Sequence, residues 1–131
     1  MYVLDTNTLI YFFKGMGKVS EKLLKTSPKE ISIPSIVAYE LEVGIAKSSS
    51  PKKRAEQLAD LISIVNILPF GLQEAKYASQ IRTALDQQGQ PIGPYDILTA
   101  ATALANKAVL VTHNTKEFGK IGQLQIEDWF A

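Results

Sequence analysis

Cysteine is absent from the 131 residues, and histidine occurs only once, at position 113. A chain without cysteine forms no disulfide, has no thiolate nucleophile and builds no Cys-ligated zinc or iron–sulfur site. No apolar run approaches the ~18 residues that a membrane-spanning helix needs. The phosphate-binding pattern GxxxxGK[ST] and the nucleophile pattern GxSxG are missing as well. These absences exclude thiol, multi-histidine and P-loop chemistry.

The charges of the chain are nearly balanced, with 14 basic and 13 acidic side chains. This balance neither favours nor excludes a nucleic-acid partner, because such a partner needs only a local basic rim. Hydrophobic residues make up 46% of the chain, which is typical of a globular domain. The N-terminal segment has no basic start and carries Asp5 inside an apolar stretch, unlike a secretory signal. We therefore expect one cytoplasmic domain over residues 1–131.

Short apolar runs alternate along the chain with amphipathic segments of helical length. The strands are predicted at 2–5, 31–33, 66–69, 108–112 and 124–126. The helices are predicted at 7–14, 16–26, 35–47, 52–65, 72–88, 94–106 and 115–118, with Ser50 and Pro51 as a start signal. Strands separated by helices predict a three-layer α/β fold, in which helices cover both faces of a mostly parallel sheet. The ligand crevice of such a sheet lies at the carboxyl ends of its strands.

Isolated carboxylates are the informative feature of the sequence. Three segments that otherwise resemble a protein core contain no charge except these acids: Asp5 in 1–13, Glu40 and Glu42 in 31–46, and Asp96 in 87–106. A buried carboxylate is costly unless it is paired, and these segments contain no lysine or arginine. Carboxylates that converge at one crevice would repel one another unless a cation lies between them. Oxygen ligands without histidine or cysteine suit Mg²⁺ or Mn²⁺.

Each acid also has a purely structural explanation. Asp5 could cap the first helix, and Asp96 would be favoured in a first helical turn by the helix dipole. Glu40 and Glu42 point roughly 200° apart on a helix, and both faces carry apolar neighbours. Spacing alone therefore does not decide which of the two glutamates faces the crevice.

The segment VTHNTKEF at 111–118 follows the most strand-like run and adds a fourth acid, Glu117. Thr112 and Asn114 are short polar groups that could orient a ligand or a water molecule. In the alternative, Asn114 forms a turn and Glu117 is an ordinary surface residue. His113 could act as a general base, or it could be a loop histidine whose hydrogen bonds are satisfied.

Four motifs in order make the sequence recognisable. They are VLDTN at 3–7, YELEVG at 39–44, PIGPYDILTAA at 91–101 and LVTHNTKEF at 110–118. This series resembles that of PIN-domain ribonucleases, in particular the VapC-type toxins of toxin–antitoxin pairs, and IEDW at 126–129 resembles the end of those toxins. The resemblance covers the whole chain and implies a PIN-like fold.

The resemblance also implies site residues and an activity. Asp5, Glu40, Asp96 and Glu117 match the catalytic, metal-binding acids, with Asp5 and Asp96 as the expected direct ligands; many PIN domains have aspartate where Glu117 stands. Supporting polar positions match Thr6, Thr112 and Asn114. The implied protein is a homodimeric Mg²⁺- or Mn²⁺-dependent endoribonuclease, which hydrolyses RNA phosphodiesters with a metal-activated water and is neutralised by a cognate antitoxin. Candidates for a basic rim around the acids are Lys14, Lys18, Lys47, Lys52, Lys53, Arg54 and Lys116.

Two other functions stay open at this point. The chain could be an inactive binding module that keeps a PIN fold. VLDTNTL also resembles the first motif of haloacid-dehalogenase-type phosphatases, although Asn7 stands where that family has its second acid. The aromatic cluster Tyr11, Phe12 and Phe13 could bind a partner protein, or it could pack inside.

Overall fold

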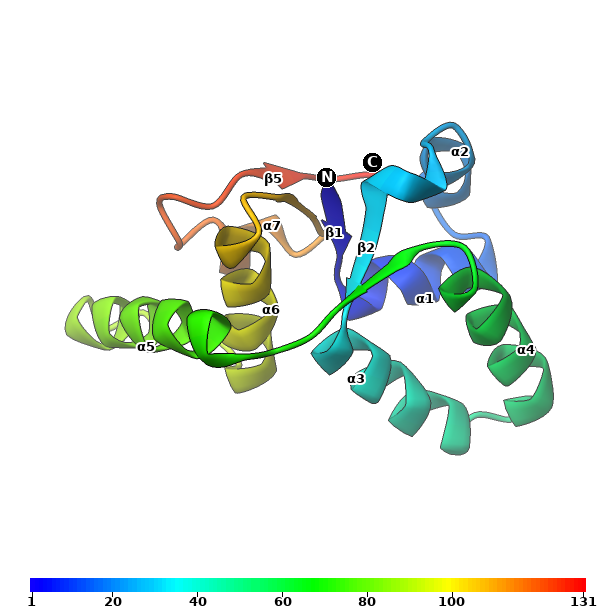
Figure 1. Cartoon of the computed structure of the whole chain (residues 1–131), viewed down its shortest axis with the longest axis horizontal. Coiled ribbons are helices and arrows are strands. Elements are labelled where there is room, and N and C mark those ends of the chain that lie inside the picture. The colour runs from blue at the N-terminus through cyan, green and yellow to red at the C-terminus, as the bar shows by residue number, and fades with distance from the viewer.

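The computed structural model describes residues 1–131 and contains a five-stranded sheet surrounded by helices (Figure 1). The strands are β1 (Tyr2–Leu4), β2 (Ile31–Pro34), β3 (Asn66–Leu68), β4 (Val109–Val111) and β5 (Ile126–Glu127). The helices are α1 (Thr6–Lys14), α2 (Val19–Leu24), α3 (Ser35–Ala46), α4 (Pro51–Ile62), α5 (Leu72–Gln87), α6 (Pro94–Ala105) and α7 (Thr115–Phe118), with a 3₁₀ turn, η1 (Pro28–Glu30). None of these helices combines the length and the hydropathy of a membrane span.

The sheet has the strand order β3-β2-β1-β4-β5, and every neighbouring pair is parallel. Central Val3 pairs with Ser32 on one side and with Leu110 on the other. The chain adds β2 and β3 on one side of β1 and then returns to add β4 and β5 on the other. The strand order therefore reverses between β1 and β4, and a ligand crevice is expected beyond the carboxyl ends of these two strands.

Alternate residues of the central strands face two separate cores. Val3 and Leu110 belong to a core that is completed by α5 and α6, whereas Leu4 and Val111 belong to a core with α1, α2, α3 and α4. Figure 1 shows α5 and α6 on one side of the strands and α1, α2 and α4 on the other. The expected three-layer α/β fold is confirmed, with a sheet that is wholly parallel.

Several expected boundaries and one cap differ from the structure. The last strand, expected at 124–126, forms at Ile126–Glu127, because Leu124 closes a turn by donating its N–H to Ile121. The helix expected from residue 16 begins at Val19, because Gly17 has a left-handed φ of 63°. The helix expected to reach residue 65 ends at Ile62, just before β3. The side chain of Ser50 makes no capping hydrogen bond, although Pro51 does begin α4.

The C-terminal segment packs closely against the turn between α1 and α2. Phe130 accepts a hydrogen bond from the Lys18 N–H at 3.1 Å. A β-carbon added to Gly17 would lie 2.6 Å from the Phe130 ring, whereas one added to Gly15 would meet nothing within 4 Å. Both glycines have positive φ, so only their surroundings distinguish them.

Alanine substitutions at these two glycines should therefore differ in cost. Gly15→Ala should lower the free energy of unfolding by about 1 kcal/mol, because alanine disfavours the left-handed conformation. Gly17→Ala should lower it by about 3 kcal/mol, because displacement of Phe130 adds to the same backbone cost. Urea denaturation of both variants measures the difference, and equal costs would show that the C-terminal segment does not pack on this turn.

Candidate active site

Asp5 lies where β1 ends and α1 begins, beside the end of β4. It is the N-cap residue of α1, and its Oδ1 accepts the Thr8 N–H at 2.9 Å. Its Oδ2 accepts the hydroxyl of Thr112 at 2.5 Å. Only 6% of Asp5 is exposed. The capping role considered from the sequence is therefore real, and the same hydrogen bonds hold the carboxylate at the crevice.

Burial dominates the electrostatics of Asp5. Loss of solvation raises the pKa of this carboxyl, while hydrogen bonds from Thr112 and Thr8 and the charge of His113 act in the opposite direction. No lysine or arginine compensates the charge, because none of the five ion pairs in the structure includes Asp5, Glu40 or Asp96. The crevice thus contains negative charge without a positive protein partner.

The packing of α3 distinguishes Glu40 from Glu42. Val37 and Leu41 are buried in the core, and Glu40 lies on a half-buried face beside the crevice. Its Oε1 accepts the hydroxyl of Thr6 at 2.7 Å. Glu42 is exposed and contributes nothing to the lining of the crevice. The structure thereby separates two residues that helical spacing could not.

Asp96 lies in the first turn of α6, which begins at Pro94. Its pKa is raised to about 6, first by burial and then by the negative charges of Asp5, Glu40 and Glu117. Asp96 is consequently close enough to the other three acids to be influenced by each of them. The helix dipole favours an acid at this position, yet that effect would lower the pKa, so burial and the neighbouring acids dominate.

A polar cleft of about 90 Å³ joins these elements. It is lined by Asp5, Thr6, Asn7, Glu40, Asp96, Thr99, Asn114 and Phe118. Sequence reasoning missed Asn7, Thr99 and Phe118 as lining residues. Thr99 could have been found from its place three residues after Asp96, which puts both on one face of α6. Asn7 and Phe118 carry no comparable signal.

The three polar residues expected from the loop after β4 have different positions relative to the cleft. Thr112 is buried, and its hydroxyl donates a hydrogen bond to Asp5. The same oxygen accepts the Asn114 N–H at 3.0 Å. Asn114 lines the cleft. Glu117 lies outside the lining, with its Oε1 3.7 Å from the Lys120 ammonium. Its negative charge nevertheless contributes to the raised pKa of Asp96.

His113 pairs with an acid that does not line the cleft. Its Nδ1 lies 2.9 Å from Oδ2 of Asp128, and its ring stacks on Phe130 with centroids 4.2 Å apart. This pair lowers the pKa of Asp128, against the opposing effect of burial. His113 is thus a loop histidine with a satisfied hydrogen bond, as the less reactive alternative expected.

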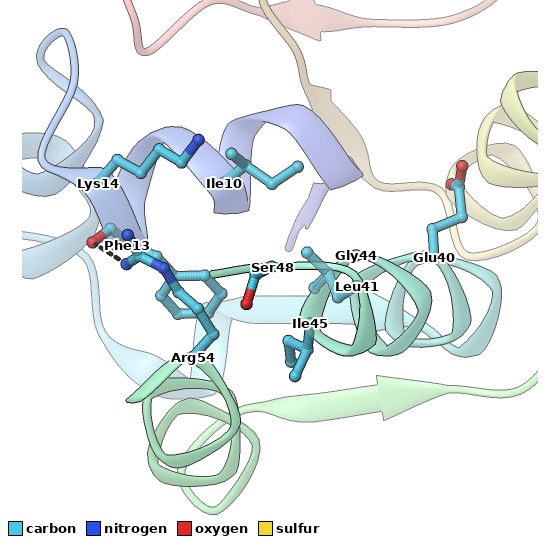
Figure 2. A pocket seen from close by; sticks show the side chains of 9 residues that line it. All are labelled: Ile10, Phe13, Lys14, Glu40, Leu41, Gly44, Ile45, Ser48 and Arg54. Carbon is cyan, nitrogen blue, oxygen red and sulfur yellow. Dashed lines mark hydrogen bonds between the residues drawn. The ribbon is translucent and has the colours of Figure 1, made fainter. Parts of the chain in front are cut away.

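A second hollow, an elongated groove, begins beside the cleft and runs between α1, α3 and α4 (Figure 2). It is lined by Ile10, Phe13, Lys14, Glu40, Leu41, Gly44, Ile45, Ser48 and Arg54. Figure 2 shows Glu40 at one end and Lys14 with Arg54 at the other. Arg54 is fixed there by donating to the Phe13 carbonyl at 3.1 Å and to Gln57 at 2.8 Å. The groove therefore leads from a basic end to the acidic cleft.

The arrangement of the strands and the order of the acids are those of a known family, since the sequence profile of the PIN domain matches residues 2–124. The chain belongs to the PIN-domain family. Its VapC-type resemblance is confirmed by 36% identity over 131 residues to ribonuclease VapC2 of Rickettsia felis, with 98% of each chain covered. The tRNA(fMet)-specific endonuclease VapC of Salmonella typhimurium is 34% identical over 128 residues, which are 98% of this chain and 97% of that one.

Solved structures agree with this membership. The PIN domain matches VapBC2 from Rickettsia felis, bound to a DNA fragment from its promoter, with a TM-score of 0.90 and 35% identity over 98% of each chain. It matches DNA-bound VapBC from Salmonella typhimurium with a TM-score of 0.90 and 35% identity, over 98% of this chain and 97% of that one. PIN-domain membership sets aside the haloacid-dehalogenase alternative.

The donor set of the PIN domain fits a hard divalent cation. Every polar side chain that lines the cleft offers oxygen, from carboxylates, hydroxyls or amides. No three acids are already arranged as ligands of one ion. Mg²⁺ does not require this, because it commonly keeps several waters and binds through one or two carboxylates. The raised pKa of Asp96 indicates that a positive charge would relieve the repulsion in the cleft.

The stability of the metal-free PIN domain should therefore depend on the charge of Asp96. Protonation favours the folded state, because the pKa of Asp96 is about 6 when folded and 3.8 in the reference state. This stabilisation is present at low pH and is lost as the pH rises through about 6. Asp96→Asn should raise the free energy of unfolding by about 1 kcal/mol at about pH 8, after allowance for screening by solvent.

Urea denaturation in EDTA at two pH values measures this effect. Near pH 3 the variant and the original protein should be almost equally stable, because Asp96 is then largely protonated in both the folded and the reference state. A gain in stability that is the same at both pH values would show that folding does not raise the pKa of Asp96.

Proposed function

We propose that this PIN domain, working as one domain over residues 1–131, is an endoribonuclease that depends on a divalent cation. The observation that carries the proposal is the gathering of Asp5, Glu40 and Asp96 in one oxygen-lined cleft without a basic partner. The activities named for the VapC relatives, a ribonuclease and a tRNA-specific endonuclease, support RNA as the substrate. The cleft lies at the switch point of the sheet, where ligands of such folds bind.

Asp5 and Asp96 would hold the cation, with Glu40 and Glu117 adding negative charge nearby. Each oxygen of Asp5 accepts one hydrogen bond and keeps a second lone pair for a ligand. When bound, Mg²⁺ or Mn²⁺ would supply positive charge to the phosphate and lower the pKa of a nearby water. The hydrogen bonds from Thr8 and Thr112 fix the position of Asp5, so this one ligand is oriented before a cation binds.

Glu40 is the residue that we assign to the attacking water. Its Oε1 accepts from Thr6, and this bond fixes the orientation of the carboxylate. Its Oε2 then remains to accept a proton from a water that attacks the phosphorus. Asn114 and Asn7 line the same cleft and can donate hydrogen bonds to phosphate oxygens. No protein side chain needs to act as a nucleophile, in keeping with the absence of cysteine.

The groove beside the cleft is the place that we propose for the antitoxin. The solved VapBC structures support a protein partner of this kind. The apolar middle of the groove, with Leu41 and Ile45, suits an apolar segment of the partner, while Lys14 and Arg54 suit its acidic residues. Because Glu40 lines both hollows, a segment in the groove would end at the acidic cleft and block it. The homodimer expected from the resemblance belongs to the same proposal.

The two glutamates of α3 give a matched test of the ribonuclease. Glu40→Gln should lower kcat by about 100-fold or more, because the general base is removed. Glu42→Gln should leave kcat within about twofold, because Glu42 is exposed and outside the cleft. Asp5→Asn and Asp96→Asn should abolish cleavage while the protein stays folded. Cleavage of a mixed RNA pool with Mg²⁺, with Mn²⁺ and with EDTA measures these effects.

Two results would contradict the proposal. Full cleavage by Asp5→Asn or Asp96→Asn would show that the acids do not form the site. Undiminished cleavage in EDTA would show that the activity does not require a divalent cation. An absence of cleavage with every RNA and metal would favour the inactive binding module instead.

Gly44 gives a test of the groove. A β-carbon at this position meets nothing within 4 Å, so a larger side chain can enter the groove without a clash inside the chain. Gly44→Phe should weaken antitoxin binding by about 10-fold or more, because its ring occupies the space of the partner. Gly44→Ala should keep the affinity within about twofold, because a methyl group fills little of this space. Isothermal titration of both variants with the antitoxin tests this. Equal affinities of the two variants would show that the antitoxin does not bind in this groove.

A further inference from the structure

Two exposed tyrosines are the sequence neighbours of two acids that line the cleft. Tyr39 directly precedes Glu40 on α3, and Tyr95 directly precedes Asp96 on α6. Their ring centroids are 5.8 Å apart, and the ring planes are inclined by 53°. Figure 1 shows the beginning of α3 beside the N-terminal end of α6, which brings these two rings together from distant parts of the sequence.

The exposure of this pair sets it apart from the other aromatic residues. Tyr39 is 52% exposed and Tyr95 is 44% exposed. The other nine aromatic side chains pack in or against one of the two cores. This includes Tyr11, Phe12 and Phe13, so the cluster considered from the sequence packs against the core and does not stand free. Core packing therefore explains nine aromatic residues and leaves this pair without a structural role.

The two side chains offer solvent two aromatic surfaces and two hydroxyl groups beside the acids of the cleft.

Unpaired RNA bases bind to surfaces of this kind. Proteins that recognise single-stranded RNA stack its splayed bases on aromatic side chains, and any base can do so because each has a π-face. A phosphodiester in the cleft has its own nucleotides on either side, so a base adjoins the rim where Tyr39 and Tyr95 lie. Stacking would also offset the repulsion between the backbone and the carboxylates, because it does not depend on charge.

We propose that Tyr39 and Tyr95 form a stacking platform for an unpaired base next to the phosphodiester that is cleaved. This inference rests on the proposed ribonuclease function and adds two residues that would hold a nucleotide of the substrate. The platform is a binding element that holds the nucleotide, and it takes no part in proton transfer.

The test measures base stacking directly, in a background that does not cleave. The probe is a single-stranded RNA 12-mer with 2-aminopurine at its centre, added to the Asp5→Asn protein. Stacking on a ring quenches the fluorescence of 2-aminopurine. Tyr39→Ala and Tyr95→Ala should each raise the Kd about 10-fold and reduce the quenching. Tyr39→Phe and Tyr95→Phe keep the ring and should keep the Kd within about twofold.

Leu24→Ala is the matched control for loss of an exposed apolar side chain, because Leu24 is 76% exposed on α2. It should change neither the Kd nor the quenching. The platform would be overturned if the alanine variants at Tyr39 and Tyr95 bound and quenched the probe as well as their parent. It would also be overturned if they lowered the molar mass in light scattering and left RNA binding unchanged, because the rings would then pack on a second copy.

The platform and the ribonuclease can fail separately. If the unmodified protein cleaves RNA and the KM is the same for the tyrosine, phenylalanine and alanine forms, the platform is wrong and the ribonuclease stands. If no RNA is cleaved but 2-aminopurine is quenched only when both rings are present, the ribonuclease is wrong, while the binding of an unpaired base by the two rings stands.

Discussion

The carboxylate of Asp5 ties together the parts of the chain that meet at the crevice. It accepts the Thr8 N–H at the start of α1 and the Thr112 hydroxyl after β4. Thr8 in turn donates its hydroxyl to the Val111 carbonyl at 3.2 Å, and Thr112 accepts the Asn114 N–H. Because β1 and β4 flank the point where the strand order reverses, one buried carboxyl group joins the two segments that leave these strands at the cleft.

This construction concentrates negative charge where the protein provides no positive charge. Glu40 is oriented by Thr6, and Asp96 is held in the first turn of α6, so neither acid depends on a basic partner for its position. The raised pKa of Asp96 reflects what this arrangement costs the folded protein without a cation. Active sites commonly sacrifice stability in this way, and a bound cation would offset the loss by binding only the folded state.

Local sequence patterns predicted the fold well because each central strand is short, apolar and bounded by clear turn or helix signals. β1 and β4 were predicted in this way, and so were Asp5 and Asp96 at the beginnings of α1 and α6. The choice between Glu40 and Glu42 depended on which face of α3 packs against the core, a tertiary property that spacing does not contain. The lining residues Asn7 and Phe118 and the contact of Tyr39 with Tyr95 likewise arise only when distant elements meet. The shift of β5 to Ile126–Glu127 depended on the turn that Leu124 closes with Ile121.

The central claim is that the negative charge around Asp96, which together with burial raises the pKa of that residue, would also bind a divalent cation. Calorimetric titration of Mn²⁺ into the protein near pH 6, in buffers of different ionisation enthalpy, tests this most directly. The account predicts that binding releases protons near pH 6, that the release fades towards about pH 8, and that Asp96→Asn removes both the release and most of the affinity. Mn²⁺ binding that is equally tight in Asp96→Asn, or the absence of any binding to the unmodified protein, would contradict it.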